Sequence, residues 1–96
     1  MPFKEFQRKS LRRRGHNLKP IVAVGTGGLT DGVLAELESA LKHHELIKIK
    51  IRTGNRECRN TVLQEILEYS KAIIIQKIGN VALLYRAAET KEIRSP

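Results

Sequence analysis

Apolar and charged residues alternate most clearly in residues 46–52, which read Leu-Ile-Lys-Ile-Lys-Ile-Arg. Successive side chains of a strand point to opposite faces, so the isoleucines share one face, and Lys48, Lys50 and Arg52 share the other. This pattern predicts a strand with one packed face and one basic face. A second strand is predicted at residues 21–24, because a short, continuous apolar run is typical of a strand buried on both faces.

Two longer segments carry apolar residues at helical spacing. Residues 31–43 follow the i, i+3, i+4, i+7 pattern of an amphipathic helix, and Thr30 stands where a capping residue is preferred. Residues 56–70 form the second segment, with Asn55 as its expected cap. The apolar stripe of the first helix contains Val33, Leu34, Leu37, Ala40 and Leu41.

The C-terminal part of the chain predicts two strands, residues 72–78 and 81–86, joined by Gly79-Asn80. A two-residue hairpin with glycine first is what a type II′ turn prefers. The strand–helix–strand order of residues 21–52 predicts a βαβ unit ahead of this hairpin. Residues 87–96 are polar and are expected to form a loose tail.

Residues 1–17 are the most basic part of the chain and are predicted to form a short helix. Phe3, Phe6 and Leu11 fall near helical spacing, and Gly15 is a natural residue to follow the last helical turn. A solvated basic arm is the alternative interpretation, and either form offers its charge to a polyanion. Up to residue 19, the cations are Lys4, Arg8, Lys9, Arg12, Arg13, Arg14 and Lys19.

The length of 96 residues allows one domain with one core. No repeat, low-complexity tract or linker divides residues 1–96, so we expect a single domain. The predicted fold is α/β: a helix followed by β-α-β-α-β-β, arranged as a two-layer sandwich with helices on one side of a four-stranded mixed sheet.

Charge narrows the choice of partners. Lys and Arg total 18 against 10 Asp and Glu, which gives a net charge of +8. Such a chain attracts polyanions, of which RNA, DNA and an anionic membrane are the natural candidates. With Cys58 as the single cysteine, no internal disulfide can form, and a reducing compartment is expected. The apolar runs are too short for a secretory signal or a membrane span, so we expect a soluble cytoplasmic protein with no membrane partner.

A glycine-rich stretch, Gly-Thr-Gly-Gly at residues 25–28, lies between the first predicted strand and the helix after it. Such a loop can bring its main chain close to a phosphate, because glycine has no side chain in the way. A Walker A loop would need Gly-Lys-Ser/Thr, which is missing, and a dinucleotide loop would need a glycine in place of Thr30. The acidic residue that binds a ribose in dinucleotide folds is also missing, since Lys50 and Arg52 stand at that place. We therefore expect no nucleotide cofactor.

Two interpretations of this loop remain. It is either a Gly-x-x-Gly clamp for a nucleic-acid backbone, as in KH domains, or a tight turn with no ligand. The basic surroundings of the loop favour the clamp.

No other group of residues predicts chemistry. His16, His43, His44 and Cys58 lack the spacing of a metal site, and Cys58 has no partner for nucleophilic catalysis. The glutamates are expected on solvated helix surfaces or at helix ends, with no acid–base pair among them. Tyr85 could stack on one base, but core packing suits it better. We therefore expect no catalysis, no metal and no cofactor.

Several segments together are typical of one known family. They are residues 18–22 (Leu-Lys-Pro-Ile-Val), 24–30 (Val-Gly-Thr-Gly-Gly-Leu-Thr), 45–50 (Glu-Leu-Ile-Lys-Ile-Lys), 78–80 (Ile-Gly-Asn) and 84–86 (Leu-Tyr-Arg). In their order and spacing the chain resembles the CRM domain family (chloroplast RNA splicing and ribosome maturation), in particular its stand-alone bacterial members of the YhbY type.

The resemblance implies a fold similar to the C-terminal domain of initiation factor three. It also implies RNA binding through the Gly-x-x-Gly loop and association with precursors of the large ribosomal subunit. Ser70-Lys71 departs from the family, in which a glycine often ends the helix.

Three functions follow as hypotheses. The first is a non-catalytic RNA-binding protein of large-subunit assembly. The alternatives are a protein-interaction module for an acidic partner and an accessory subunit of an RNA-processing enzyme. For the first, the expected RNA contacts are Gly25, Thr26, Gly27, Gly28, Arg8, Lys9, Arg12, Arg13, Arg14, Lys19, Lys48, Lys50 and Arg52.

Overall fold

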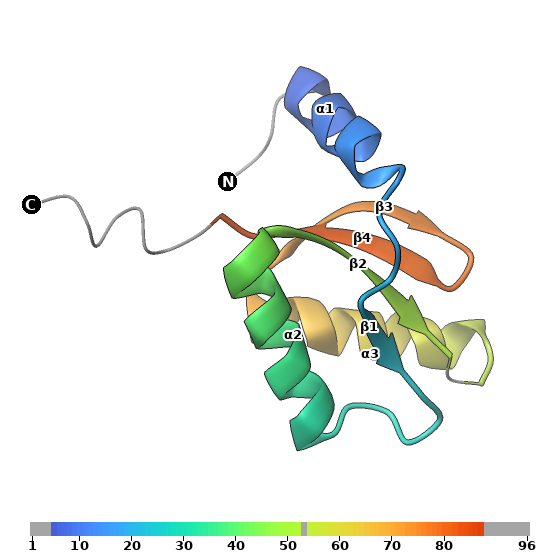
Figure 1. Ribbon diagram of the computed structural model, residues 1–96. Helices are drawn as coiled ribbons and strands as arrows, with labels where there is room; N and C mark the ends of the chain where they lie inside the picture. The colour runs from blue at the N-terminus through green and yellow to red at the C-terminus, as the bar shows by residue number, and fades with distance from the viewer. Residues whose placement is uncertain (1–4, 53, 88–96) are drawn as a thin grey trace, which may run out of the picture.

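The helices and strands follow one another in the order that the sequence predicts (Figure 1). The computed structural model describes residues 5–52 and 54–87, so the predictions about residues 1–4, with Phe3 and Lys4, and about residues 88–96 lie outside the described residues. No helix within the described ranges is long and apolar enough to cross a membrane. The elements are α1 (Glu5–Gly15), β1 (Val22–Val24), α2 (Asp31–His44), β2 (Leu46–Ile51), α3 (Arg56–Ser70), β3 (Ile73–Ile78) and β4 (Val81–Tyr85).

The strands form one mixed sheet in the order β1-β2-β4-β3. β1 runs parallel to β2, with Val22 opposite Ile49, as the predicted βαβ unit requires. β4 is antiparallel to both β2 and β3 and lies between them. Near the end of β2, Lys50 pairs with Val81, the first residue of β4. The ends of β1 and β2, the hairpin turn and the start of α3 thus meet at one end of the sheet, which we call the loop end.

α2 and α3 cover one face of the sheet and enclose the larger core (Figure 1). Ile47, Ile49 and Ile51 of β2 face these helices, as the alternation in the sequence predicts. Removing these side chains from water supplies the main favourable free energy of folding. The core contains Val22, Val24, Leu37, Leu41, Ile47, Ile49, Ile51, Leu63, Ile66, Ala72, Ala82 and Leu84.

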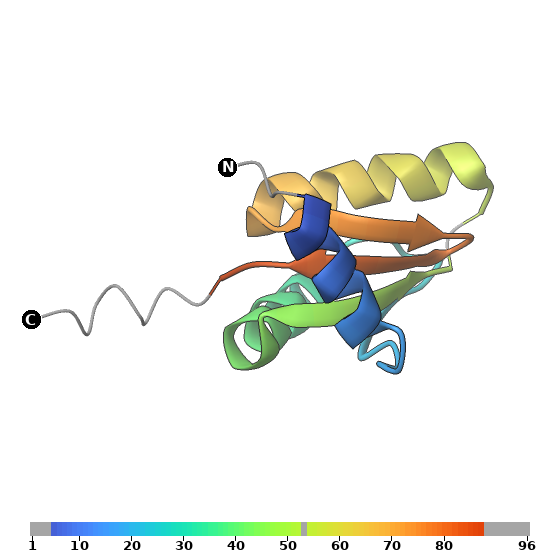
Figure 2. The same ribbon diagram turned by 90° about the horizontal axis from the view of Figure 1, so that it is seen from above.

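α1 lies across the opposite face of the sheet (Figure 2). Its Leu11 packs with Leu46, Ile75 and Leu83 in a second, smaller core. The sequence predicts the helices on one side only, whereas α1 adds a partial layer on the other side. The physical reason is that Leu11 and these strand residues bury one another there and so leave water together.

Gly15 ends α1 for a reason that differs from the expected one. A glycine that follows a helix usually adopts a left-handed backbone, but the described glycines with positive φ are Gly28 and Gly79. Gly15 is instead the buried last residue of α1, where an added Cβ would lie 2.5 Å from Cδ2 of Leu83. Close packing of α1 on the sheet therefore requires a residue without a side chain.

The predicted helix caps and the predicted hairpin turn are confirmed. The Val33 N–H donates to Thr30 Oγ1 at 3.2 Å, and the Cys58 N–H donates to Asn55 Oδ1 at 2.9 Å. Both predicted caps therefore satisfy a backbone donor in the first turn of their helix. Gly79 has a φ of +59° at the first position of the hairpin, as a type II′ turn requires.

Arg86 joins the end of β4 to the helical layer. Its guanidinium donates to the two carboxylate oxygens of Glu38 at 3.0 and 2.9 Å and to the Ser70 carbonyl at 2.9 Å. The buried Ser70 hydroxyl in turn donates to the Ile66 carbonyl at 2.7 Å and accepts from the Ala72 N–H at 3.2 Å. The hydrogen bond from Arg86 lowers the pKa of Glu38, because it favours the charged carboxylate. Arg86 thus links the strand to both α2 and α3.

Candidate nucleic-acid interface

The loop after β1 is a tight four-residue turn. The Gly28 N–H donates to the Gly25 carbonyl at 3.0 Å, and Gly28 has a φ of +75°. A residue with a side chain would be strained at this φ, so the turn itself explains the glycine at position 28. Thr30 then caps α2, which holds the loop between the end of β1 and the first turn of the helix.

Gly25 and Gly27 have no such requirement, because neither has a positive φ. A Cβ atom added to either residue would meet no atom within 4 Å. Residues 25–27 are exposed, and Gly28 is half-buried. The main chain is therefore bare at both glycines, and a sugar–phosphate backbone can approach it closely.

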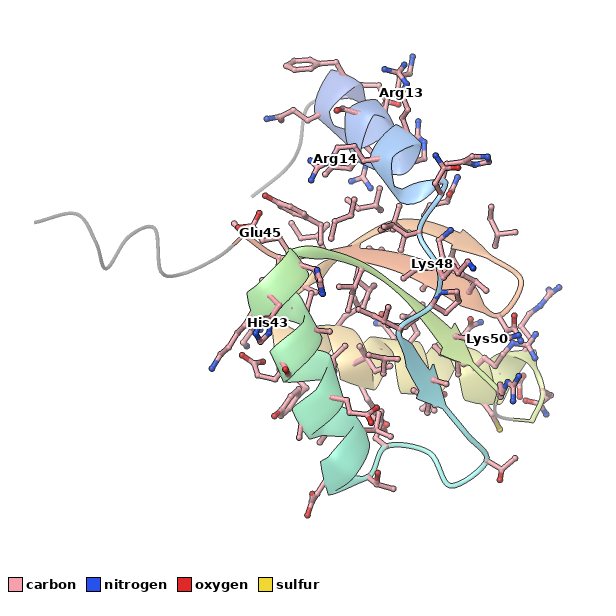
Figure 3. The ribbon with its side chains drawn as sticks, in the orientation of Figure 1. Arg13, Arg14, His43, Glu45, Lys48 and Lys50 are labelled. Carbon is pink, nitrogen blue, oxygen red and sulfur yellow. The ribbon has the colours of Figure 1, made fainter. Side chains whose placement is uncertain are left out.

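Arg52 is a cation that the structure places beside this loop. Its N–H donates to the Val24 carbonyl at 2.7 Å, which fixes the end of β2 against the residue before Gly25. Arg52 is exposed, and Lys48 and Lys50 precede it on β2, half-buried (Figure 3). Both lysines lie on the sheet face that α1 partly covers, because they alternate in step with Leu46.

The expected contacts on α1 lie away from the loop. Figure 1 shows α1 above one face of the sheet, whereas the loop leads to α2 on the other face. Arg8 donates to the Ile74 carbonyl at 3.0 Å and so helps to hold α1 on β3, and Arg12 lies 3.6 Å from the Glu5 carboxylate. The exposed cations of this region are Lys9, Arg13, Arg14 and Lys19.

The predicted residues therefore fall into two groups, one around the loop and one on α1. A sheet with all its helices on one side would leave the basic face of β2 uncovered, but Lys48 and Lys50 share the face of the sheet on which α1 lies. The reason is the position of α1, which docks on the basic face of β2 and not on the packed one.

Three further cations at the loop end were missed from the sequence. Arg56 and Arg59 lie one turn apart at the start of α3, and Lys77 lies near the end of β3. The spacing of the two arginines after the Asn55 cap was a usable signal, because residues three apart share one side of a helix. Lys77 carried no such signal, since only the folding of the hairpin brings it to α3.

Comparisons with known proteins identify the family. A model of the CRS1/YhbY (CRM) domain matches residues 3–86. The chain belongs to the CRM domain family. This CRM domain is 43% identical over 90 residues to "RNA-binding protein" of Haemophilus influenzae, covering 94% of this chain and 91% of that protein. It is 45% identical over 86 residues to a "Probable RNA-binding protein" of Pseudomonas aeruginosa, covering 90% and 83% of the two chains.

The fold is also found in a solved structure. The solution structure of the hypothetical protein SAV1595 from Staphylococcus aureus matches this CRM domain with a TM-score of 0.77 and 25% identity, over 92% of each chain. The family and the α/β fold expected from the sequence are therefore confirmed.

Proposed function

We propose that this CRM domain binds RNA, with the Gly25–Gly28 loop clamping the sugar–phosphate backbone and neighbouring cations neutralising its charge. The observation that carries the proposal is the bare main chain at Gly25 and Gly27, next to the exposed Arg52. A loop of this kind needs no sequence-specific contact to hold a strand, because it meets the backbone and not the bases.

The names of the relatives support the same ligand. The proteins of Haemophilus influenzae and Pseudomonas aeruginosa, which this chain matches over nearly its whole length, are both named for RNA binding. The net charge of +8 suits a polyanion of any sequence.

The finer part of the proposal concerns the kind of RNA and the absence of catalysis. Resemblance to the YhbY type supports ribosomal RNA in precursors of the large subunit as the partner, in the cytoplasm. A binding role is also supported by the chemistry of the loop, whose glycines and neighbouring cations can hold a phosphate but offer no general base to activate a nucleophile against it.

A substitution at Gly27 tests the loop. Gly27→Leu adds a side chain where no atom lies within 4 Å and where φ is not positive, so the fold is retained. We expect this variant to bind single-stranded RNA at least about tenfold more weakly, or about 1.4 kcal/mol, with an unchanged melting temperature. Ala35→Leu, at an exposed position of α2, is the matched control and should bind like the wild type. Unchanged RNA binding by Gly27→Leu would remove the loop from the proposal.

Sedimentation of cell extracts tests the partner. The protein should co-sediment with precursors of the large subunit, and treatment with RNase should release it. Co-sedimentation that survives complete RNA digestion would instead favour a protein-interaction module with an acidic partner.

A further inference from the structure

Hydrogen bonds at the loop end hold three neighbouring segments in place. The Arg52 N–H donates to the Val24 carbonyl at 2.7 Å, and the Ile51 N–H donates to the Asn80 carbonyl at 2.7 Å. The end of β2 is therefore tied on one side to the residue before the Gly25–Gly28 loop and on the other side to the hairpin turn. These bonds join the loop, the end of β2 and the hairpin turn into one connected backbone at the loop end.

Cations from separate elements lie at the loop end. Arg56 is the first residue of α3 and is exposed, and Arg59 follows one turn later. The Arg59 Nη1 donates to the Gly54 carbonyl at 3.3 Å, which turns its guanidinium toward the segment leading out of β2. Figure 3 shows side-chain nitrogens crowded at the start of α3, near the labelled Lys50.

Lys77 joins this group from β3. Its Nζ donates to Asn60 Oδ1, in the second turn of α3, so its charge lies on the α3 side of the sheet. We call Arg52, Arg56, Arg59 and Lys77 the sheet-end cluster. Arg52 directly follows β2, Arg56 and Arg59 belong to α3, and Lys77 belongs to β3. The cluster therefore forms only when the sheet is assembled.

No ion pair among the described residues neutralises the charges of the sheet-end cluster. The ion pairs found within residues 5–52 and 54–87 are Arg12–Glu5 and Arg86–Glu38, and neither involves the cluster. Glu57 in the first turn of α3 brings one negative charge to this region, against the four cations. Like charges held close together repel one another, so such a group is favourable only when an anion binds to it.

We infer that an RNA strand clamped at the Gly25–Gly28 loop continues across the loop end of the sheet, so that its next phosphates meet the sheet-end cluster. This inference rests on the proposed function and adds to it the path of the strand. Three strand spacings of about 4.8 Å separate β1 from β3, or about 14 Å in all. At about 3.4 Å per stacked nucleotide, roughly four nucleotides beyond the clamp cover this distance.

The test uses residues that the proposed function does not already include. The double variant Arg56→Gln/Lys77→Gln removes two charges from the sheet-end cluster. The control Lys42→Gln/Lys71→Gln removes two exposed charges at the ends of α2 and α3, at the opposite end of the sheet. Binding is measured by fluorescence anisotropy with single-stranded RNA of about 4 and about 12 nucleotides, lengths that fill the clamp alone and the clamp with the extended path. Thermal melting confirms that each variant is folded.

We expect the cluster variant to bind the longer RNA about tenfold more weakly than the wild type. The slope of log K against log [salt] should become shallower by about 1.4, because about 0.7 is lost for each phosphate contact to a single strand. With the shorter RNA the cluster variant should bind like the wild type. The charge control should bind both RNAs within about twofold of the wild type, since it leaves both sites intact.

Two results would overturn the inference while leaving the proposed function in place. One is equal binding of the longer RNA by the cluster variant and the charge control, while Gly27→Leu still weakens binding. The other is an equal loss for both RNA lengths in the cluster variant, which would place Arg56 or Lys77 at the clamp itself. If the wild type binds neither RNA, the proposed function fails and the inference fails with it.

Discussion

The two ends of the sheet use arginine in opposite ways. At the end where α2 and α3 stop, the Arg86 side chain is 16% exposed and donates to Glu38 and Ser70. At the loop end, Arg52 and Arg56 are exposed and make no ion pair with any described residue. The same residue type therefore stabilises the fold where the protein supplies a carboxylate, and Arg52 and Arg56 are available to a ligand because no described carboxylate pairs with them.

Glycine shows the same contrast. The space beside Gly15 is filled by Leu83, whereas the space beside Gly27 is empty to 4 Å. The first glycine is explained by packing within the protein. The second is not explained by packing among the described residues, and the proposed contact with an RNA backbone gives a reason for a glycine at that position.

The largest effect in this comparison is expected for Gly15→Val. The added side chain would meet Leu83 at the place where α1 packs on the sheet, so the free energy of unfolding should fall by about 2–3 kcal/mol. Urea unfolding followed by circular dichroism measures this. Gly27→Leu is the matched variant at the open site and should change the free energy of unfolding by less than about 0.5 kcal/mol. Equal stability losses at the two glycines would contradict the difference between a packed site at Gly15 and an open site at Gly27.

A pair of arginine variants gives the next largest effect. Arg86→Ala leaves Glu38 and the Ser70 carbonyl without their donor, and should lower the free energy of unfolding by about 2 kcal/mol. Arg52→Gln should leave stability unchanged within about 0.5 kcal/mol. RNA binding should reverse this order, with Arg52→Gln reducing the salt slope by about 0.7 and Arg86→Ala leaving it unchanged when measured well below its melting temperature. A stability loss for Arg52→Gln equal to that of Arg86→Ala would contradict this assignment.

The stability contributed by the Arg86–Glu38 pair is expected to depend on pH. The folded state lowers the pKa of Glu38, chiefly through the hydrogen bond from Arg86, so the pair stabilises the protein at and above the ordinary carboxyl pKa. This contribution is lost as the pH falls through the lowered pKa and Glu38 takes up a proton. Glu38→Gln should therefore be less stable than the wild type by about 1 kcal/mol at neutral pH, because a charge-assisted bond becomes a neutral one.

Melting of Glu38→Gln and the wild type across a pH series checks this prediction. The difference between the two proteins should shrink as the solution becomes acidic. A difference that stays constant down to the pH at which every carboxyl group is protonated would show that Glu38 acts through packing and not through its charge.

The smallest effect is expected at the end of α3. Lys71 has a φ of 62° and a ψ of 19°, a left-handed conformation that favours glycine. Lys71→Gly should raise the free energy of unfolding by about 0.5–1 kcal/mol and leave RNA binding unchanged. Chemical unfolding measures the gain, and Lys42→Gly, inside the last turn of α2, is the control that should instead lose stability. A loss of stability in Lys71→Gly would mean that the lysine side chain contributes more than the backbone strain costs.

Local patterns predicted most of the secondary structure, because they depend on residues a few positions apart. The caps at Thr30 and Asn55, the alternation in residues 46–52 and the turn at Gly79 were all found where the sequence placed them. The open loop was also predicted as a candidate site, since three glycines between a strand and a helix are visible without any structure. The sequence could not show that Gly28 is required by its positive φ while Gly25 and Gly27 leave the main chain bare. Both φ and the empty space beside a residue depend on the folded backbone.

Local sequence patterns were enough to predict the order of the elements, the packed and basic faces of β2, and the family. Only the tertiary structure decided that α1 docks on the basic face, that Arg86 meets Glu38 across 48 positions of the chain, and that Lys77 reaches α3. The physical reason is that local propensity acts within a few residues, whereas these contacts arise from the packing of whole elements against one another. The cations at the loop end are scattered along the sequence, and the order and direction of the strands bring them to one end of the sheet.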